Sequence, residues 1–191
     1  MQLNMYSELT AYLSELENAF AEIPDARKKL LGEVAAYIDQ KLKNGDTVKL
    51  NFICTHNSRR SHLAQIWTAT AAAHFGVDHI ETYSGGTEAT AFNPRAVAAL
   101  ERAGFRIDNP GGDNPEYQVH YSDSHLPLIA FSKTFDYPSN PHSGFAAIMT
   151  CSDADENCPF IPGAEYRASV NYIDPKVSDG TDEEAATYDE R

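Results

Sequence analysis

One segment constrains the fold more than any other: a mainly apolar stretch, Val48–Ile53, leads directly into Cys54 and a short polar loop. The run is typical of a buried β-strand, and residues Ser61 to Phe75 carry apolar side chains at the spacing of an amphipathic helix. A strand, a short loop and a helix in this order are typical of α/β folds, whose functional groups gather at the carboxyl ends of the strands. We therefore expect a functional site at Cys54.

The remainder of the chain continues the alternation of strands and helices. We expect further strands at residues 81–84, 126–131, 145–150 and 168–173, and a helix from Asn93 to Ala103. Residues 108–123 are rich in Gly, Asn and Pro, which favours an irregular loop. The pattern predicts an α/β fold: a three-layer sandwich around a central, mostly parallel four-stranded sheet, plus an N-terminal helical hairpin.

The predicted hairpin occupies residues 1–45, where apolar residues recur every three or four positions in two stretches separated by Pro24. We expect this appendage to pack on the main domain, residues 46–191, or on a second subunit of a homodimer. A role at a membrane surface is the alternative, which the acidic polar face disfavours.

Charge and hydropathy argue against two classes of partner, nucleic acids and membranes. The chain has 15 Lys and Arg against 28 Asp and Glu, a formal charge of −13, which argues against nucleic acid as a partner. It has no apolar run of the roughly 18 residues that a membrane helix needs, and no secretory signal pattern. We expect no membrane association and a cytoplasmic protein, where three cysteines indicate catalysis or redox chemistry more than structural disulfides.

The loop that follows Cys54 has the composition of an oxyanion site. Backbone N–H groups at a helix start bind tetrahedral anions, and the same field favours a cysteine thiolate. Arg60 offers a bidentate clamp, Ser61 a hydrogen bond to the sulfur, and Asn57 bonds that hold the loop. The alternative is a core cysteine and a solvated arginine, since a C-x5-R spacing is common. The expected oxyanion-binding residues are Thr55, His56, Asn57, Ser58, Arg59, Arg60 and Ser61.

The sequence Cys-Thr-His-Asn-Ser-Arg-Arg-Ser at 54–61 resembles the signature of the low-molecular-weight protein tyrosine phosphatase superfamily, which includes phosphatases and thioredoxin-coupled arsenate reductases. The resemblance extends over roughly residues 47–191. Tyr-Ser-Gly-Gly-Thr-Glu at 83–88 and Phe-Asn-Pro-Arg-Ala-Val at 92–97 are similar to the second strand and helix of the family, and Ile-Asp-Pro at 173–175 to its Asp-Pro loop. The resemblance implies a nucleophilic Cys54 and Asp174 as general acid, although Asp-Pro alone is a common turn dipeptide.

Two more cysteines, Cys151 and Cys158, lie in an acidic segment. They resemble the redox segment of the thioredoxin-coupled reductases, where two cysteines at this spacing relay a disulfide. Alternatives are a buried Cys151 with an incidental Cys158, or a zinc site, which the long spacing disfavours. The resemblance implies five catalytic residues, no metal, no bound cofactor and a thioredoxin-like dithiol reductant. The five are Cys54, Arg60, Asp174, Cys151 and Cys158.

Three function hypotheses follow. The first is an arsenate reductase with a three-cysteine thiol-disulfide relay. The second is a phosphatase of phosphotyrosine or small phosphoesters that forms a cysteinyl-phosphate, for which Tyr117, Tyr121 and Phe135 could supply an aromatic cleft. The third is a non-catalytic oxyanion-binding or redox-sensing module.

Three departures from the family pattern accompany the resemblance. His56 stands where the family usually has Gly, and Arg59 where many members have Cys, which adds positive charge at the mouth of the site. The chain ends soon after Tyr188, where the family has a further helix over the sheet. We expect either a truncated chain or cover of that surface by the N-terminal hairpin.

Overall fold

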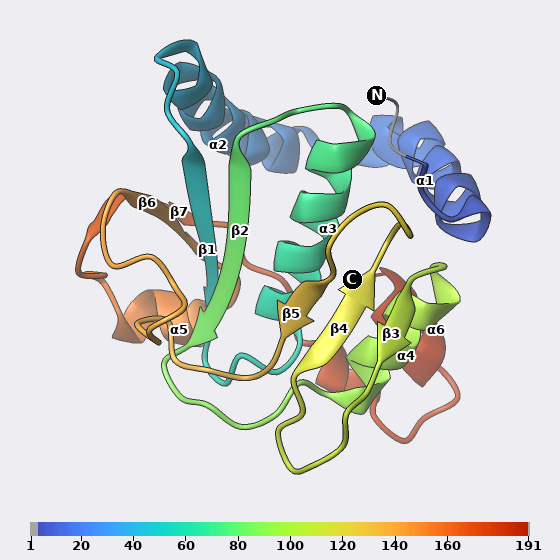
Figure 1. Cartoon of the computed structure of the whole chain (residues 1–191). Helices are drawn as coiled ribbons and strands as arrows, with labels where there is room; N and C mark the ends of the chain where they lie inside the picture. Colours follow the sequence, from blue (N-terminus) through green and yellow to red (C-terminus); the bar gives the residue numbers. More distant parts are fainter. Residues whose placement is uncertain (1–3, 191) are drawn as a thin grey trace.

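The computed structural model describes residues 4–190, and its centre is a sheet of four parallel strands in the order β2-β1-β6-β7 (Figure 1). The strands are β1 (Val48–Cys54), β2 (Ile80–Gly86), β6 (Phe145–Met149) and β7 (Ala164–Ser169). β1 and β6 lie in the middle and are almost wholly buried, which fits the continuous apolar sequence of β6 and the mainly apolar sequence of β1. The predicted parallel four-stranded sheet is confirmed.

The register of the strands brings their carboxyl ends to one edge of the sheet. Cys54, the last residue of β1, pairs with Gly86 at the end of β2, and Ile53 pairs with Met149 at the end of β6. Cys151 follows Met149 by two positions. The parallel arrangement therefore brings Cys54 and Cys151, far apart in the sequence, to the same edge.

Side chains alternate between the two faces of the sheet, and each face has its own hydrophobic cluster. Leu50, Phe52 and Ile148 lie in the cluster covered by α2 (Asp25–Lys43) and by α3 (Arg60–His74). On the opposite face, the alternate residues of β1 and β6 pack against α5 (Ser152–Asn157) and the residues that follow it. Helices thus lie on both faces, as the three-layer prediction requires.

A second, antiparallel sheet lies beside the first and has the order β3-β4-β5. Its strands are β3 (Arg106–Asp108), β4 (Tyr117–His120) and β5 (Leu128–Ala130). It shares a hydrophobic cluster with α1 (Ser7–Ala19), α3, α4 (Pro94–Arg102) and α6 (Glu184–Glu190). The small sheet, α1, α4 and α6 lie at the right of Figure 1.

Several predicted boundaries were wrong. The expected loop at 108–123 contains β4, in which alternate residues are buried. This strand is only four residues long, so its alternating pattern is short, and the Gly and Pro residues before it favour a loop. The strand expected at 168–173 begins instead at Ala164. The cysteine-bearing segment forms the short helix α5, and α6 and the 3-10 helix η2 (Pro175–Ser178) were not predicted.

The two N-terminal helices are present, joined by the 3-10 helix η1 (Phe20–Glu22) and Pro24. They pack on different clusters: Leu9 and Leu13 of α1 on the cluster of the small sheet, and α2 on the central sheet. α2 thus lies on the face where the family resemblance led us to expect a further helix. A domain boundary at residue 45 and a homodimer through this segment stay predictions, and residues 1–3 lie outside the described part.

No helix among residues 4–190 is both long and apolar enough to cross a membrane.

Two glycines offer a test of the packing of α1. Gly104 has φ +103°, and a Cβ there would collide with the backbone of Glu8 and Leu9. Gly104→Ala should therefore lower the free energy of unfolding by more than about 1 kcal/mol. Gly32, inside α2, has open space where a Cβ would lie, so Gly32→Ala should raise it by about 0.5–1 kcal/mol. Urea denaturation measures both, and equal effects would contradict the packing described.

Candidate active site

The loop between β1 and α3 has its carbonyl groups held outward by neighbouring segments. The bonds run from Thr87 N to Cys54 O (3.1 Å), Glu88 N to Thr55 O (2.8 Å), Ser132 Oγ to His56 O (2.9 Å) and Asn93 N to Ser58 O (2.8 Å). Across a trans peptide the next N–H points the opposite way, and the described residues contain no cis peptide. The N–H groups of this loop therefore face its interior, at the N-terminus of α3, which is a nest for an anion.

Cys54 lies at the floor of this nest and is almost fully buried, with 3% of its surface exposed. Its sulfur is 3.1 Å from Ser61 Oγ, and Asn57 Nδ2 donates to the same hydroxyl at 2.9 Å. Because the hydroxyl accepts from Asn57, its own proton is free to be donated to the sulfur. The Ser61 hydroxyl and the N-terminus of α3 therefore both present hydrogen-bond donors on the side of the Cys54 sulfur.

Asn57 also fixes the shape of the loop. It is fully buried, its φ is 44°, and its Oδ1 accepts from the backbone N–H of Lys133 at 2.9 Å. Gly86 is required on the other side, because a Cβ there would collide with the loop backbone at Thr55 and Asn57. The positioning role expected for Asn57 agrees with these contacts.

Arg60 and Asp174 meet at the mouth of the nest. Arg60 Nη2 is 2.8 Å from Asp174 Oδ2, and Nη1 donates to the Tyr172 carbonyl at 3.2 Å. Asp174 also caps η2 by accepting from Lys176 N at 3.0 Å. Both side chains line a small hollow together with Cys54, His56, Ser58 and Arg59. A carboxyl group and a guanidinium therefore lie beside the Cys54 thiol.

Arg59 is held differently from what we expected. Its Nε donates to Tyr188 Oη at 2.8 Å, and its guanidinium lies 3.6 Å from Asp179 and 3.9 Å from Asp174. The side chain joins the loop to the C-terminal segment, so it does not stand as free positive charge at the mouth. Burial and the bond to Asp179 raise the pKa of Tyr188 to about 12, which keeps this phenol a neutral partner.

His56 lies at the outer rim, where its Nε2 is 3.6 Å from Glu88 Oε2. Its φ is not among the positive ones, so the loop accepts a side chain here without left-handed backbone. Glu88 was not predicted as a site residue.

The second and third cysteines share the hydrophobic cluster that contains Cys54. Cys151 is buried, its sulfur accepts from Ala154 N at 3.4 Å as the cap of α5, and it lies 3.5 Å from Thr55 Oγ1. Cys158 is half-buried at the other end of α5. All three cysteines are free thiols, and all three contact the same hydrophobic cluster.

The aromatic cleft is not found at the mouth. Tyr117 and Tyr121 are buried in the cluster of the small sheet, and Phe135 packs beside the cluster of the cysteines. Within residues 4–190, no group of three or more His, Cys, Asp or Glu side chains is arranged to hold a metal ion.

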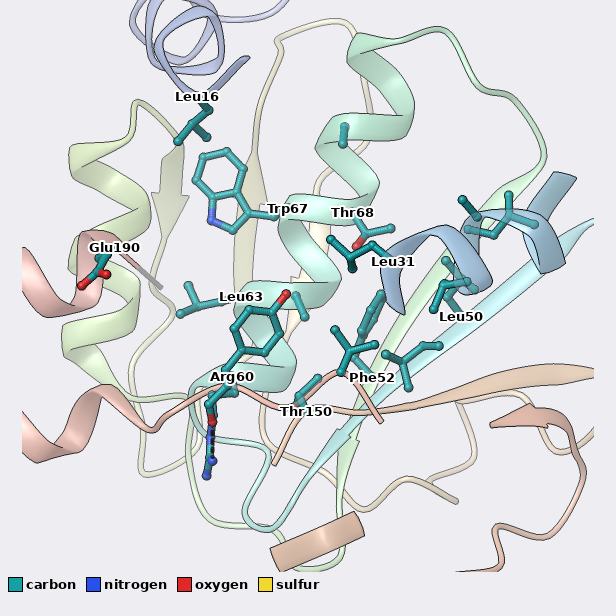
Figure 2. A pocket seen from close by; sticks show the side chains of 18 of the residues that line it. Leu16, Leu31, Leu50, Phe52, Arg60, Leu63, Trp67, Thr68, Thr150 and Glu190 are labelled. Carbon is teal, nitrogen blue, oxygen red and sulfur yellow. Dashed lines mark hydrogen bonds between the residues drawn. The ribbon is translucent and has the colours of Figure 1, made fainter. Parts of the chain in front are cut away.

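A larger hollow lies on the other side of Arg60, between α1, α2, α3 and the central sheet (Figure 2). It has a volume of about 460 Å³ and a mainly apolar lining, which includes Leu31, Phe52 and Trp67. Figure 2 shows the Arg60 side chain extending away from these residues. An apolar cavity does not suit a charged oxyanion, so the small hollow above Cys54 is the candidate site.

Lys133, which sequence reasoning missed, is a buried support of the loop. Its side chain is 5% exposed, and its Nζ lies 3.5 Å from the Phe131 carbonyl and 4.6 Å from the centre of that ring. Burial lowers the pKa of Lys133 to about 8, against a weaker opposing effect of Glu116. Nothing in the local sequence marks this lysine as buried.

This lysine gives a pH-dependent prediction. Between about pH 8 and pH 10.5 the folded chain loses this proton while the unfolded chain keeps it, so this group makes the wild type more stable as pH rises. Lys133→Met should be more stable than wild type at pH 7, by on the order of 2–3 kcal/mol, and the difference should shrink towards pH 10. Urea denaturation across this range tests it, and a constant difference would contradict it.

Comparison with known proteins agrees with this geometry. Residues 49–114 match the family model described as low molecular weight phosphotyrosine protein phosphatase. An arsenate reductase of Bacillus licheniformis is 31% identical over 140 residues, which cover 73% of this chain and 83% of the relative.

Two further relatives have similar values. An arsenate reductase of Bacillus subtilis is 30% identical over 73% of this chain and 83% of its own length. Arsenate reductase 2 of Staphylococcus epidermidis is 30% identical over 68% and 80%. The chain belongs to the low-molecular-weight protein tyrosine phosphatase superfamily, in its arsenate reductase branch.

Proposed function

We propose that this enzyme reduces arsenate to arsenite by a three-cysteine thiol-disulfide relay, with a thioredoxin-like dithiol as reductant. The observation that carries the proposal is the position of the cysteines: Cys54 in the anion nest, and Cys151 and Cys158 in contact with the same hydrophobic cluster. Relatives named arsenate reductase cover most of the chain and support the same chemistry. The reductant implies a reducing compartment, the cytoplasm.

The first step uses the nest. Arsenate is a tetrahedral oxyanion, and it would accept bonds from the loop N–H groups and from Arg60, whose guanidinium moves from Asp174 to the anion. The Cys54 thiolate attacks arsenic, so an S–As bond forms and an As–O bond breaks. Asp174 gives its proton to the departing oxygen, which leaves as water.

The second step is the reduction. The Cys151 thiolate attacks the sulfur of Cys54, the Cys54–Cys151 disulfide forms, and the electron pair of the S–As bond stays on arsenic. As(V) becomes As(III) and leaves as arsenite, while two thiols have been oxidised. Cys151 lies beside Thr55 in the loop, which supports a short path for this attack.

The third step passes the disulfide outward. Cys158 attacks Cys151, which frees Cys54 as a thiolate and leaves a Cys151–Cys158 disulfide. A thioredoxin-like dithiol then reduces this disulfide and is itself oxidised. Cys158 is the more exposed of the two, so it suits exchange with a second protein.

Phosphatase activity is the second candidate, because the residues it needs are complete without Cys151 and Cys158. Cys54, Arg60 and Asp174 line the small hollow together. Phosphate and arsenate have nearly the same shape and charge, so the nest suits both. The absence of Tyr117, Tyr121 and Phe135 from this hollow favours small anions over phosphotyrosine.

The cysteines separate the two functions. In Cys151→Ser and Cys158→Ser, arsenate turnover with thioredoxin, thioredoxin reductase and NADPH should fall by at least about 100-fold, because a hydroxyl cannot form a disulfide. Hydrolysis of p-nitrophenyl phosphate, which needs only Cys54 chemistry, should stay within about twofold of wild type. Hydrolysis without any arsenate turnover in the wild type would instead make the protein a phosphatase.

The general acid gives a separate prediction. Asp174→Asn should lower p-nitrophenyl phosphate turnover by about 10²–10⁴-fold through loss of the proton donor. Phosphate affinity, measured by calorimetry, should be retained or rise, because Arg60 loses its competing carboxylate. Equal losses of turnover and affinity would show that Asp174 only holds Arg60 in place.

A further inference from the structure

The helix α5 stands between the two cysteines of the proposed relay. Cys151 is its N-terminal cap and Cys158 follows its last residue. At 1.5 Å per residue, the helix keeps their Cα atoms about 10 Å apart, whereas a disulfide needs them within about 7 Å. The third step of the proposed function therefore requires α5 to open, and the contacts that hold α5 closed control that step.

α5 has little stability of its own. It has six residues, Ser-Asp-Ala-Asp-Glu-Asn, most of which are weak helix formers, and a helix this short is not stable alone. Its N-terminal cap is the bond from Ala154 N to the Cys151 sulfur. External contacts must therefore keep it folded.

The main polar anchor is Asp155. Its carboxylate pairs with Arg167, accepts from Ser169 Oγ at 2.7 Å and lies 3.4 Å from Asn171 Nδ2. These three residues belong to β7 and the segment that follows it. Arg167 also donates to the backbone carbonyls of Asp155 at 2.8 Å and of Cys158 at 3.3 Å. One carboxylate and one guanidinium thus connect both halves of α5 to the edge strand of the central sheet.

We propose that Asp155, held by Arg167 and Ser169, is a positioning residue that sets how often α5 opens and so how fast Cys158 reaches Cys151. This inference rests on the proposed relay. Asp155 is absent from the lining of the small hollow above Cys54, so its effect falls on disulfide transfer. Burial alone would raise the pKa of Asp155, but the bonds from Ser169 and Arg167 lower it overall, so the carboxylate stays ionised and paired.

The test needs no arsenate. In a Cys54→Ser background, Cys151 and Cys158 are the remaining thiols of the chain, and diamide oxidises them to a disulfide only when α5 opens. Asp155→Asn should speed this reaction about tenfold, because a charge-assisted bond contributes at least that factor to an opening equilibrium. Intact-mass spectrometry follows the loss of two hydrogens, and amide exchange of residues 152–157 should rise in parallel. A residue with only a general structural role would not accelerate disulfide formation.

Asp153→Asn is the matched control. Asp153 lies in the same first turn of α5, so it has the same relation to the helix dipole, but it is exposed and lies outside the anchor. Its substitution should change the diamide rate by less than about twofold. Equal rates in Asp155→Asn and Asp153→Asn would overturn the proposal.

Ser169→Ala covers the case in which Asp155→Asn does not fold. It removes one bond to the carboxylate and should speed disulfide formation several-fold, and an unchanged rate would overturn the proposal. Failure of the relay itself would appear elsewhere, as loss of arsenate turnover in the wild type, while the diamide rates still report on α5.

Discussion

The geometry of the site depends on one buried side chain, that of Asn57. Its amide donates to the Ser61 hydroxyl that contacts the Cys54 sulfur, and its oxygen accepts from the Lys133 backbone. Its backbone lies in the left-handed region, which Asn enters more readily than most residues. One residue therefore joins the end of β1, the start of α3 and the segment after β5, and the inward N–H groups of the loop depend on that connection.

The two adjacent arginines of this loop, Arg59 and Arg60, have different partners. Arg60 faces Asp174 at the mouth, where an arriving oxyanion can replace the carboxylate. Arg59 turns to Tyr188 and Asp179 and ties the loop to the C-terminal segment. In the proposed function, local donors would have to hold a small anion, because the net charge of −13 gives an overall field that repels it. The Asp174 carboxylate balances the charge of the Arg60 guanidinium. In the proposed function, an oxyanion would take the place of that carboxylate.

The sequence allowed us to predict the parts of the structure that are formed by residues close together in the chain. The mainly apolar strand that ends at Cys54, the loop and the helix after it form one continuous segment, so their order already placed Cys54 at the start of the loop. The Arg59–Tyr188 bond, the buried Lys133 and the anchor of Asp155 join segments that are distant in the sequence, and no periodic pattern marks them. The strand β4 was missed for a related reason, since four residues give too little alternation to distinguish a strand from a loop.

In the proposed relay, the chemistry of one step prepares the conformation for the next. The Cys151 sulfur is the acceptor that caps α5, and the same sulfur is the nucleophile of the second step. While Cys151 is bonded to Cys54, the pairing of Asp155 with Arg167 would remain the main polar anchor of the helix. The anchor of Asp155 would thus keep Cys158 away from Cys151 until α5 opens. The same sulfur atom would then act first as a structural acceptor, next as a nucleophile, and finally as the electrophile that Cys158 attacks.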